Sequence, residues 1–229
     1  MLRLEQRHQN ATFIEILDKF WNDQYNIDIF WNERYKIARP KAFEREKALI
    51  TAMQLFWRKG YAATSVEDLT GALGLSRSSL YDTFGDKRTL FLEALRRYSS
   101  AVISRIARTL AESPSPLAGI QTIFDELTAG VGGESGAMGC FMVNSVAELV
   151  PYDPDVTEIA AAYTETIQRL LTETLTQGAL QNIVTRRQTP EQLAAYVFNM
   201  IQGMRVLIKS GATREQAQAI SAITLQSLQ

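Results

Sequence analysis

The chain has 229 residues, of which 46% are hydrophobic and 21% are charged, with a formal net charge of −1. Its single Cys excludes an intrachain disulfide framework. The single His, His8, argues against a histidine-based metal site or a Ser-His-Asp triad. No apolar run approaches the ~18 residues of a transmembrane helix, and the chain start lacks the apolar core of a signal peptide. We therefore expect a cytoplasmic protein with no membrane segment.

The near-neutral charge argues against a nucleic-acid partner, but it is unevenly distributed. Residues 37–98 contain 11 Lys+Arg and 7 Asp+Glu, whereas residues 99–229 contain 8 and 12. Basic charge concentrated in a small segment is typical of a phosphate-backbone partner. An excess of four charges over such a length is also common by chance, so charge alone decides little.

The first helical pattern is an amphipathic stripe of Leu49, Ala52, Met53 and Phe56. After it, Thr64 as N-cap and Glu67 at the third helical position predict a capping box, and Gly74 ends the short helix that this box opens. Ser76 caps the next helix and Asp86 a long one. The predicted helices span 44–59, 65–73, 77–84 and 86–110.

Prolines and glycines divide the rest of the chain into further helices. The predicted segments are a helix over 115–131, a Gly-rich loop over 130–139, and helices over 140–150, 154–177, 190–210 and 213–228. No strand run and no βαβ spacing occurs. The predicted fold class is all-α.

Two short helices joined by a Gly-containing turn, 65–73 and 77–84, have the form of a helix-turn-helix. The predicted exposed positions of the second helix carry short or planar hydrogen-bonding groups: Arg77, Ser78, Ser79, Tyr81, Asp82 and Thr83. An arginine can bridge guanine O6 and N7, while hydroxyl groups serve phosphates or base edges. The content of this helix favours a DNA groove over a hydrophobic interface.

The stretch 43–95, with TSVEDLTGALGLSRSSLYDTFGDKRTLF at its centre, resembles the DNA-binding domain of the tetracycline-repressor (TetR) family. The most specific part is LY-x-x-F-x-x-K, formed by Leu80, Tyr81, Phe84 and Lys87. The resemblance implies an N-terminal three-helix helix-turn-helix domain over 37–95. It also implies a larger helical ligand-binding and dimerisation domain over 96–229, with residues 1–36 as an extension.

The resemblance also implies roles for individual residues on a pseudo-palindromic double-stranded operator. Base reading falls to Arg77 and Ser78, and phosphate binding to Ser79, Tyr81, Thr83 and Lys87. Thr64 and Ser65 begin a helix whose N–H groups can hold a phosphate, and Arg39 and Lys41 lie within reach of the backbone or minor groove. Asp82 departs from the pattern, because an acid facing DNA repels phosphate.

Residues 99–229 carry no catalytic constellation, so we expect no enzyme, no cofactor and no metal site. Their apolar helices carry soft and polar side chains, Arg205 among them, that suit a small-molecule effector pocket. Core packing is the alternative for each such residue. The candidate ligand or sensor residues are Cys140, Phe124, Phe141, Asn144, Tyr163, Met200 and Met204.

The run Gly139–Ser145 resembles the helix start of family members that sense electrophiles or oxidants through a cysteine. A thiol at a helix N-terminus is favoured as thiolate, and Lys209 is expected to favour it further if the helices cross there. The alternative is that Cys140 is a small buried hydrophobe.

The last two helices are expected, by resemblance, to pair with those of a second subunit in a four-helix interface, with Gly203 allowing a close crossing. Their apolar positions are Leu193, Val197, Met200, Ile201, Met204, Leu207, Ile220 and Ile223.

Residues 1–36 contain a near repeat, FWNDQY at 20–25 and FWNERY at 30–35. One interpretation is an added helix that packs on the dimer or contacts DNA. The other, slightly favoured, is a misassigned start site, so that the repeat is translated operator DNA.

Together these patterns predict a homodimeric DNA-binding repressor, released by a small-molecule ligand or by modification of a cysteine. The alternatives are a helical enzyme and a helical interaction module without DNA binding.

Overall fold

The computed structural model describes residues 41–229, with side chains from Arg45 onward. Every regular element in this range is a helix, so the expected all-α class is confirmed. The repeat near the N-terminus and Arg39 lie outside the described residues, as does the side chain of Lys41.

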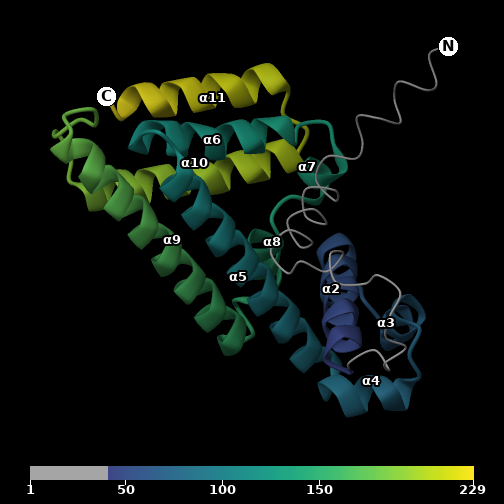
Figure 1. Ribbon diagram of the computed structural model, residues 1–229. Coiled ribbons are helices and arrows are strands. Elements are labelled where there is room, and N and C mark those ends of the chain that lie inside the picture. Colours follow the sequence, from purple (N-terminus) through teal and green to yellow (C-terminus); the bar gives the residue numbers. More distant parts are fainter. Residues whose placement is uncertain (1–40) are drawn as a thin grey trace, which may run out of the picture.

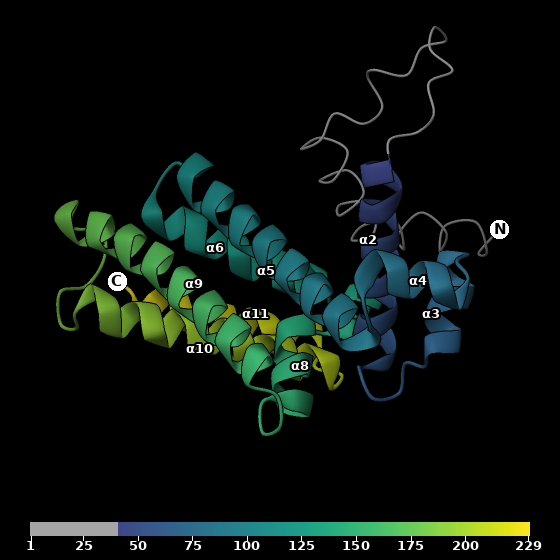
Figure 2. The ribbon, with the colours of Figure 1, turned by 90° about the horizontal axis from the view of Figure 1, so that it is seen from below.

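Three helices form a head at one end of the molecule (Figures 1 and 2), and one long helix joins it to the rest. The head contains α2 (Lys41–Lys59), α3 (Val66–Leu73) and α4 (Arg77–Phe84). The joining helix is α5 (Lys87–Glu112), which packs against α2 near its start and against the other helices farther along.

The remaining helices form the body. They are α6 (Pro116–Ala129), α7 (Glu134–Met138), α8 (Phe141–Leu149), α9 (Pro154–Leu180), α10 (Pro190–Lys209) and α11 (Arg214–Ser227). Helix α9 packs along α10 and α5, and α11 covers α6, as Figure 1 shows.

Side-chain caps explain why most helices begin where the sequence predicts. The hydroxyl of Ser76 accepts from the Ser79 N–H at 3.1 Å, and the carboxylate of Asp86 accepts from the Thr89 N–H at 2.7 Å. Ser115 and Thr213 cap α6 and α11 in the same way. Each cap satisfies an N–H group that the first helical turn leaves unpaired.

Two glycine-based predictions are wrong. The stretch 130–139, expected as a loop, contains the short helix α7. Gly178, expected to end a helix, lies inside α9 and is buried. A Cβ there would overlap Val184, so this glycine allows a close approach of the chain and does not stop the helix.

Head and body share one hydrophobic core, with an aromatic cluster where they meet. The rings of Trp57 and Tyr98 lie 5.0 Å apart, and the Phe141 ring lies 5.6 Å from Tyr98 and 5.7 Å from Phe91. These edge-to-face contacts hold α2, α5 and α8 together.

Ion pairs reinforce the same junction. Arg88 of α5 contacts Asp153 at 2.8 Å and also Asp155, and Arg58 of α2 contacts Glu134 at 3.1 Å.

Candidate nucleic-acid interface and sensor site

Helices α3 and α4 form a helix-turn-helix whose turn depends on Gly74. This residue has φ +63°, a left-handed conformation that glycine adopts without strain, and ends α3. In α4 the side chains of Leu80 and Phe84 are buried in the head core, whereas Arg77, Ser78, Tyr81 and Thr83 are exposed. The helix therefore presents a polar face to solvent.

The predicted cap of α3 is wrong by one residue. Ser65 is the N-cap, and its hydroxyl accepts from the Asp68 N–H at 3.0 Å while the Asp68 carboxylate accepts from the Ser65 N–H at 2.9 Å. Thr64 is fully buried and donates its hydroxyl to the Gly60 carbonyl at 2.6 Å. Its side chain therefore faces the head interior, while Ser65 stays exposed at the helix start.

Arg77 is held only by weak surface contacts. Its guanidinium lies 3.7 Å from the Glu67 carboxylate and donates to the Tyr81 hydroxyl at 3.4 Å. Exposed contacts of this kind contribute little to stability, so the arginine can exchange them for a stronger partner. Lys87 sits with its ammonium 4.3 Å from the centre of the Tyr61 ring.

Cys140 is the N-cap residue of α8 and is buried. Its sulfur accepts hydrogen bonds from Arg205 Nη1 at 3.2 Å and from the Tyr98 hydroxyl at 3.3 Å. Arg205 Nη1 also donates to the Tyr163 hydroxyl at 3.2 Å. The expected cation near this thiol is present, but it is Arg205.

Lys209, the cation expected beside Cys140, lies elsewhere. Its ammonium donates to Asn144 Oδ1 at 2.8 Å, and Asn144 donates through its amide nitrogen to the Met138 carbonyl at 3.0 Å. Arg205 lies one helical turn before Lys209 on the same face of α10, and it is Arg205 that is buried whereas Lys209 is exposed.

The two tyrosines of this cluster are neutral near pH 7. Burial raises the pKa of Tyr98 well above its usual range, and Cys140 adds to the increase. Burial also raises the pKa of Tyr163, although Arg205 opposes this shift. Neither phenol therefore supplies a negative charge beside Arg205.

A cavity of about 190 Å³ opens beside this cluster. We call it the Arg205 cavity; it is lined by Trp57, Tyr98, Arg105, Glu126, Leu127, Ala129, Gly130, Ser135, Gly136, Gly139, Arg205 and Ile208. Its walls come from head and body alike, because Trp57 belongs to α2.

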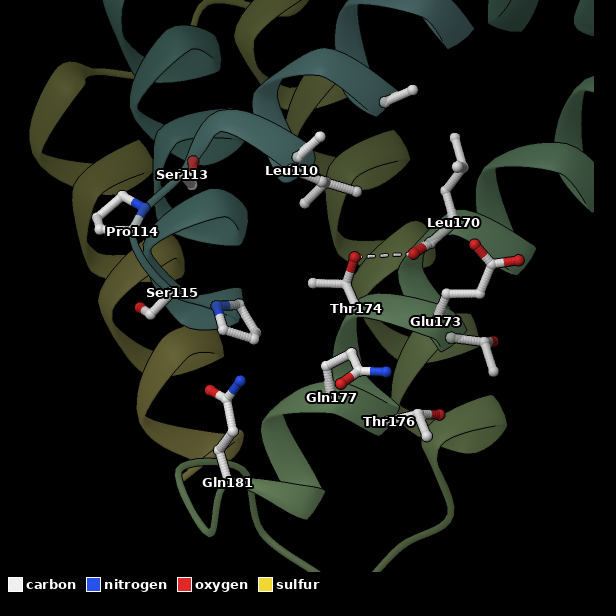
Figure 3. Close-up of a pocket in the computed structure, with 14 residues that line it drawn as sticks. Leu110, Ser113, Pro114, Ser115, Leu170, Glu173, Thr174, Thr176, Gln177 and Gln181 are labelled. Carbon is white, nitrogen blue, oxygen red and sulfur yellow. Dashed lines mark hydrogen bonds between the residues drawn. The ribbon is translucent and has the colours of Figure 1, made fainter.

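A second, wider cleft of about 700 Å³ lies at the far end of the body, between the end of α5, the start of α6 and α9 (Figure 3). Leu110, Ser113 and Pro114 face Leu170, Glu173 and other α9 residues across it, and most of the α9 side chains are polar. Its charged residue, Glu173, is paired with Arg169 at 3.1 Å.

None of the predicted sensor side chains lines either of these two cavities. Phe124, Phe141, Tyr163 and Met204 are buried in the core, while Asn144 and Met200 are half-buried. Cys140 reaches the Arg205 cavity indirectly, through its bonds to Tyr98 and Arg205. Sequence reasoning gave no role to Trp57, Tyr98 or Arg105. Arg205, which the sequence analysis named among the polar side chains suited to an effector pocket, does line this cavity.

The apolar residues of α10 and α11 divide into a set buried within the subunit and a set exposed on its surface. Leu193, Val197, Ile201 and Met204 pack in the subunit's own core, so these four side chains are not available to an interface, and the pairing of the two helices stays a prediction. The exposed apolar side chains of α10 and α11 are Tyr196, Val206, Leu207 and Ile223, and a Cβ at Gly203 would meet open space.

Within residues 41–229, no helix is long and apolar enough to cross a membrane. The same range holds no group of three or more His, Cys, Asp or Glu side chains arranged to bind a metal ion.

Residues 49–94 match the family described as "Bacterial regulatory proteins, tetR family". The HTH-type transcriptional repressor ComR of Escherichia coli (strain K12) is 31% identical over 189 residues, covering 82% of this chain and 90% of ComR. The uncharacterized HTH-type transcriptional regulator YezE of Bacillus subtilis (strain 168) is 33% identical over 145 residues, covering 63% of this chain and 73% of YezE.

Solved structures agree with this assignment. A cysteine mutant of the TetR family regulator CifR, complexed with 26-bp double-strand operator DNA, superposes with a TM-score of 0.72 at 28% identity, covering 84% of this chain and 100% of that one. The reduced form of E. coli NemR has a TM-score of 0.75 at 19% identity, covering 82% and 97%, and so shares the fold. This chain belongs to the TetR family of DNA-binding transcriptional regulators.

Proposed function

We propose that this regulator is a homodimeric repressor that reads a pseudo-palindromic operator with α4 and leaves it when an effector or a thiol reagent acts on the body. In this proposal residues 37–95 are the DNA-binding part and residues 96–229 the regulatory part. The main support for this proposal is the exposed face of α4. Its side chains are polar, whereas helix faces that pack inside a protein are apolar.

The residues on that face divide by chemistry. Arg77 and Ser78, at the start of α4, are the proposed base-reading residues, because the N-terminal residues of a recognition helix contact base edges. Ser79, Tyr81, Thr83 and Lys87 are the proposed phosphate contacts, and Ser65 offers the N-terminus of α3 to a phosphate. Thr64 is not included, because its side chain is buried.

A second copy of the chain is the proposed partner of α10 and α11. Val206, Leu207 and Ile223 leave 51%, 46% and 64% of their surface exposed, which is unusual for large apolar side chains on adjoining helices. A two-fold pairing over this face would bury them and place two α4 helices on successive half-sites.

Release of DNA is proposed to begin at either the thiol or the cavity beside it. Arg205 Nη1 donates to the Cys140 sulfur at 3.2 Å and also lines the cavity, so a reagent at the thiol and a ligand in the cavity act on the same side chain. Adding a group to this buried sulfur would displace Arg205 or the start of α8, because the core has no room for it.

Binding to the DNA upstream of the protein's own gene tests the proposal. A gel shift is expected to give a dissociation constant of ~10⁻⁸–10⁻¹¹ M, weakening steeply as salt rises. A random fragment of equal length is the control. Equal affinity for both fragments would refute sequence-specific regulation at this site.

A further inference from the structure

Arg205 is a buried cation with no acidic partner in the described part of the chain. Only 8% of its surface is exposed, and its hydrogen bonds, to Cys140 and Tyr163, both leave from Nη1. The ion pairs of residues 45–229 do not include it. An arginine stays protonated in proteins, so this charge is permanent.

Such a charge is costly unless an anion accompanies it. A buried ion without a partner loses its hydration and gains nothing equivalent. The neighbouring phenols of Tyr98 and Tyr163 are neutral, since burial raises the pKa of both. Within the described residues, the donors Nε and Nη2 of Arg205 have no acceptor, and the residue lines an open cavity.

The cavity itself favours a negatively charged guest. Arg105 and Glu126 also line it and form an ion pair at 3.6 Å, so the charge of Arg205 is the one left uncompensated among the lining residues. Leu127, Ile208 and Trp57 supply an apolar wall. A volume of about 190 Å³ is below the ~300–1,000 Å³ of drug-sized sites, so the guest must be compact.

We propose that the Arg205 cavity is an effector site selective for a small organic carboxylate with an apolar or aromatic body. The carboxylate would accept from the free donors of Arg205, the pairing that a guanidinium makes best. The effector role rests on the proposed function, whereas carboxylate binding does not.

The position of the cavity connects such a guest to the head. Trp57 lies in α2, and its neighbour Arg58 pairs with Glu134 of α7, next to the cavity residue Ser135. A ligand between Trp57 and Arg205 would therefore contact α2, the helix that supports α3 and α4. By binding there it would shift the head relative to the body.

Calorimetric titration of the full chain tests carboxylate binding with two matched pairs, benzoate against benzamide and acetate against acetamide. We expect at least one acid to bind tenfold or more tightly than its amide. Arg205→Met and Arg105→Met should each reduce that preference, and Arg169→Met, on the exposed side of α9, should keep it. Cys140→Ser should also keep it. Circular dichroism verifies that each variant is folded.

Two results would overturn the carboxylate site: neither acid binding more tightly than its amide, or Arg205→Met and Arg105→Met both keeping the preference. A gel shift with operator DNA tests the effector role separately. The preferred acid should weaken operator binding at least tenfold in the wild type and not in Arg205→Met, and binding without release would refute that role. Because titration uses the protein without DNA, a chain that binds the acid but no operator would count against the proposed function alone.

Discussion

The carboxylate of Glu148 accepts the backbone N–H of Ala62 at 2.7 Å, and its second oxygen accepts the N–H of Tyr61 at 3.1 Å. Glu148 is in the last turn of α8, the helix that begins after Cys140. The loop that it holds joins α2 to α3. A rigid helix of 9 residues thus spans the distance from the thiol to the head.

Glu148→Gln should uncouple head from body, because an amide offers one acceptor atom for two N–H groups. Operator binding is expected to respond less to effector or thiol reagent, with a modest change in affinity without them. The measurement is a gel shift before and after treatment. Glu158→Gln, an exposed position of α9, is the control, and an unchanged response in Glu148→Gln would contradict the coupling.

Arg77→Ala and Lys87→Ala should affect operator binding differently. Loss of a base-reading arginine costs ~1–3 kcal/mol of discrimination and relaxes sequence preference. Loss of a phosphate contact weakens binding to all sequences alike and lowers the salt slope by about one. Competition gel shifts at several salt concentrations separate the two. The assignment fails if both variants lose specificity equally.

Cys140→Ser should make operator binding insensitive to iodoacetamide, since the chain has no other cysteine. The wild type is expected to lose at least tenfold in affinity after alkylation, confirmed by mass spectrometry, because the added group does not fit the packed cluster around the sulfur. An alkylated wild type that binds like the untreated protein would show that the cysteine is only a core residue.

Leu207→Arg should convert a dimer into a monomer, because the charge would be buried without a partner in the proposed interface. Analytical ultracentrifugation measures the change. Tyr152→Arg, which alters an exposed apolar residue near the start of α9, should leave the assembly intact. Identical masses for wild type and Leu207→Arg would place the interface on another surface.

Asp68 should contribute stability at neutral pH that disappears in acid. Its hydrogen bond with Lys59, followed by those with Ser65, lowers its pKa from 3.8 to about 2. Because folding lowers the pKa of Asp68, its contribution to the free energy of unfolding is fully present above the pKa of the unfolded state. This contribution is lost as pH falls through the pKa of the folded state. Asp68→Asn should therefore have a lower Tm than wild type at pH 7, with a difference that shrinks between about pH 4 and pH 2.

Local chemistry was enough to predict most of the fold. Stripes of apolar residues, side-chain caps such as Ser76 and Asp86, and the left-handed Gly74 are all local signals. The errors came where tertiary packing decides: Gly178 stays helical because Val184 packs against it, and Thr64 is drawn into the head core, which moves the cap to Ser65.

The regulatory site was harder to predict, because its residues come from helices far apart in the chain. Cys140, Tyr98 and Arg205 meet only when α5, α8 and α10 pack together. No spacing in the sequence relates them, so a lysine was expected where an arginine lies. Likewise, periodicity marks the apolar positions of α10 but does not tell which of them face the core and which face outward.

Hydroxyl-radical footprinting of the protein on its operator tests the central claim most directly. The account predicts two protected half-sites related by a two-fold axis, their centres ~10 bp or a multiple of one helical turn apart. In a parallel experiment, protection of guanine N7 from methylation by dimethyl sulfate should disappear at the base-reading positions in Arg77→Ala. A footprint without two-fold symmetry, or one that Arg77→Ala leaves unchanged, would contradict an operator read by α4 of a dimer.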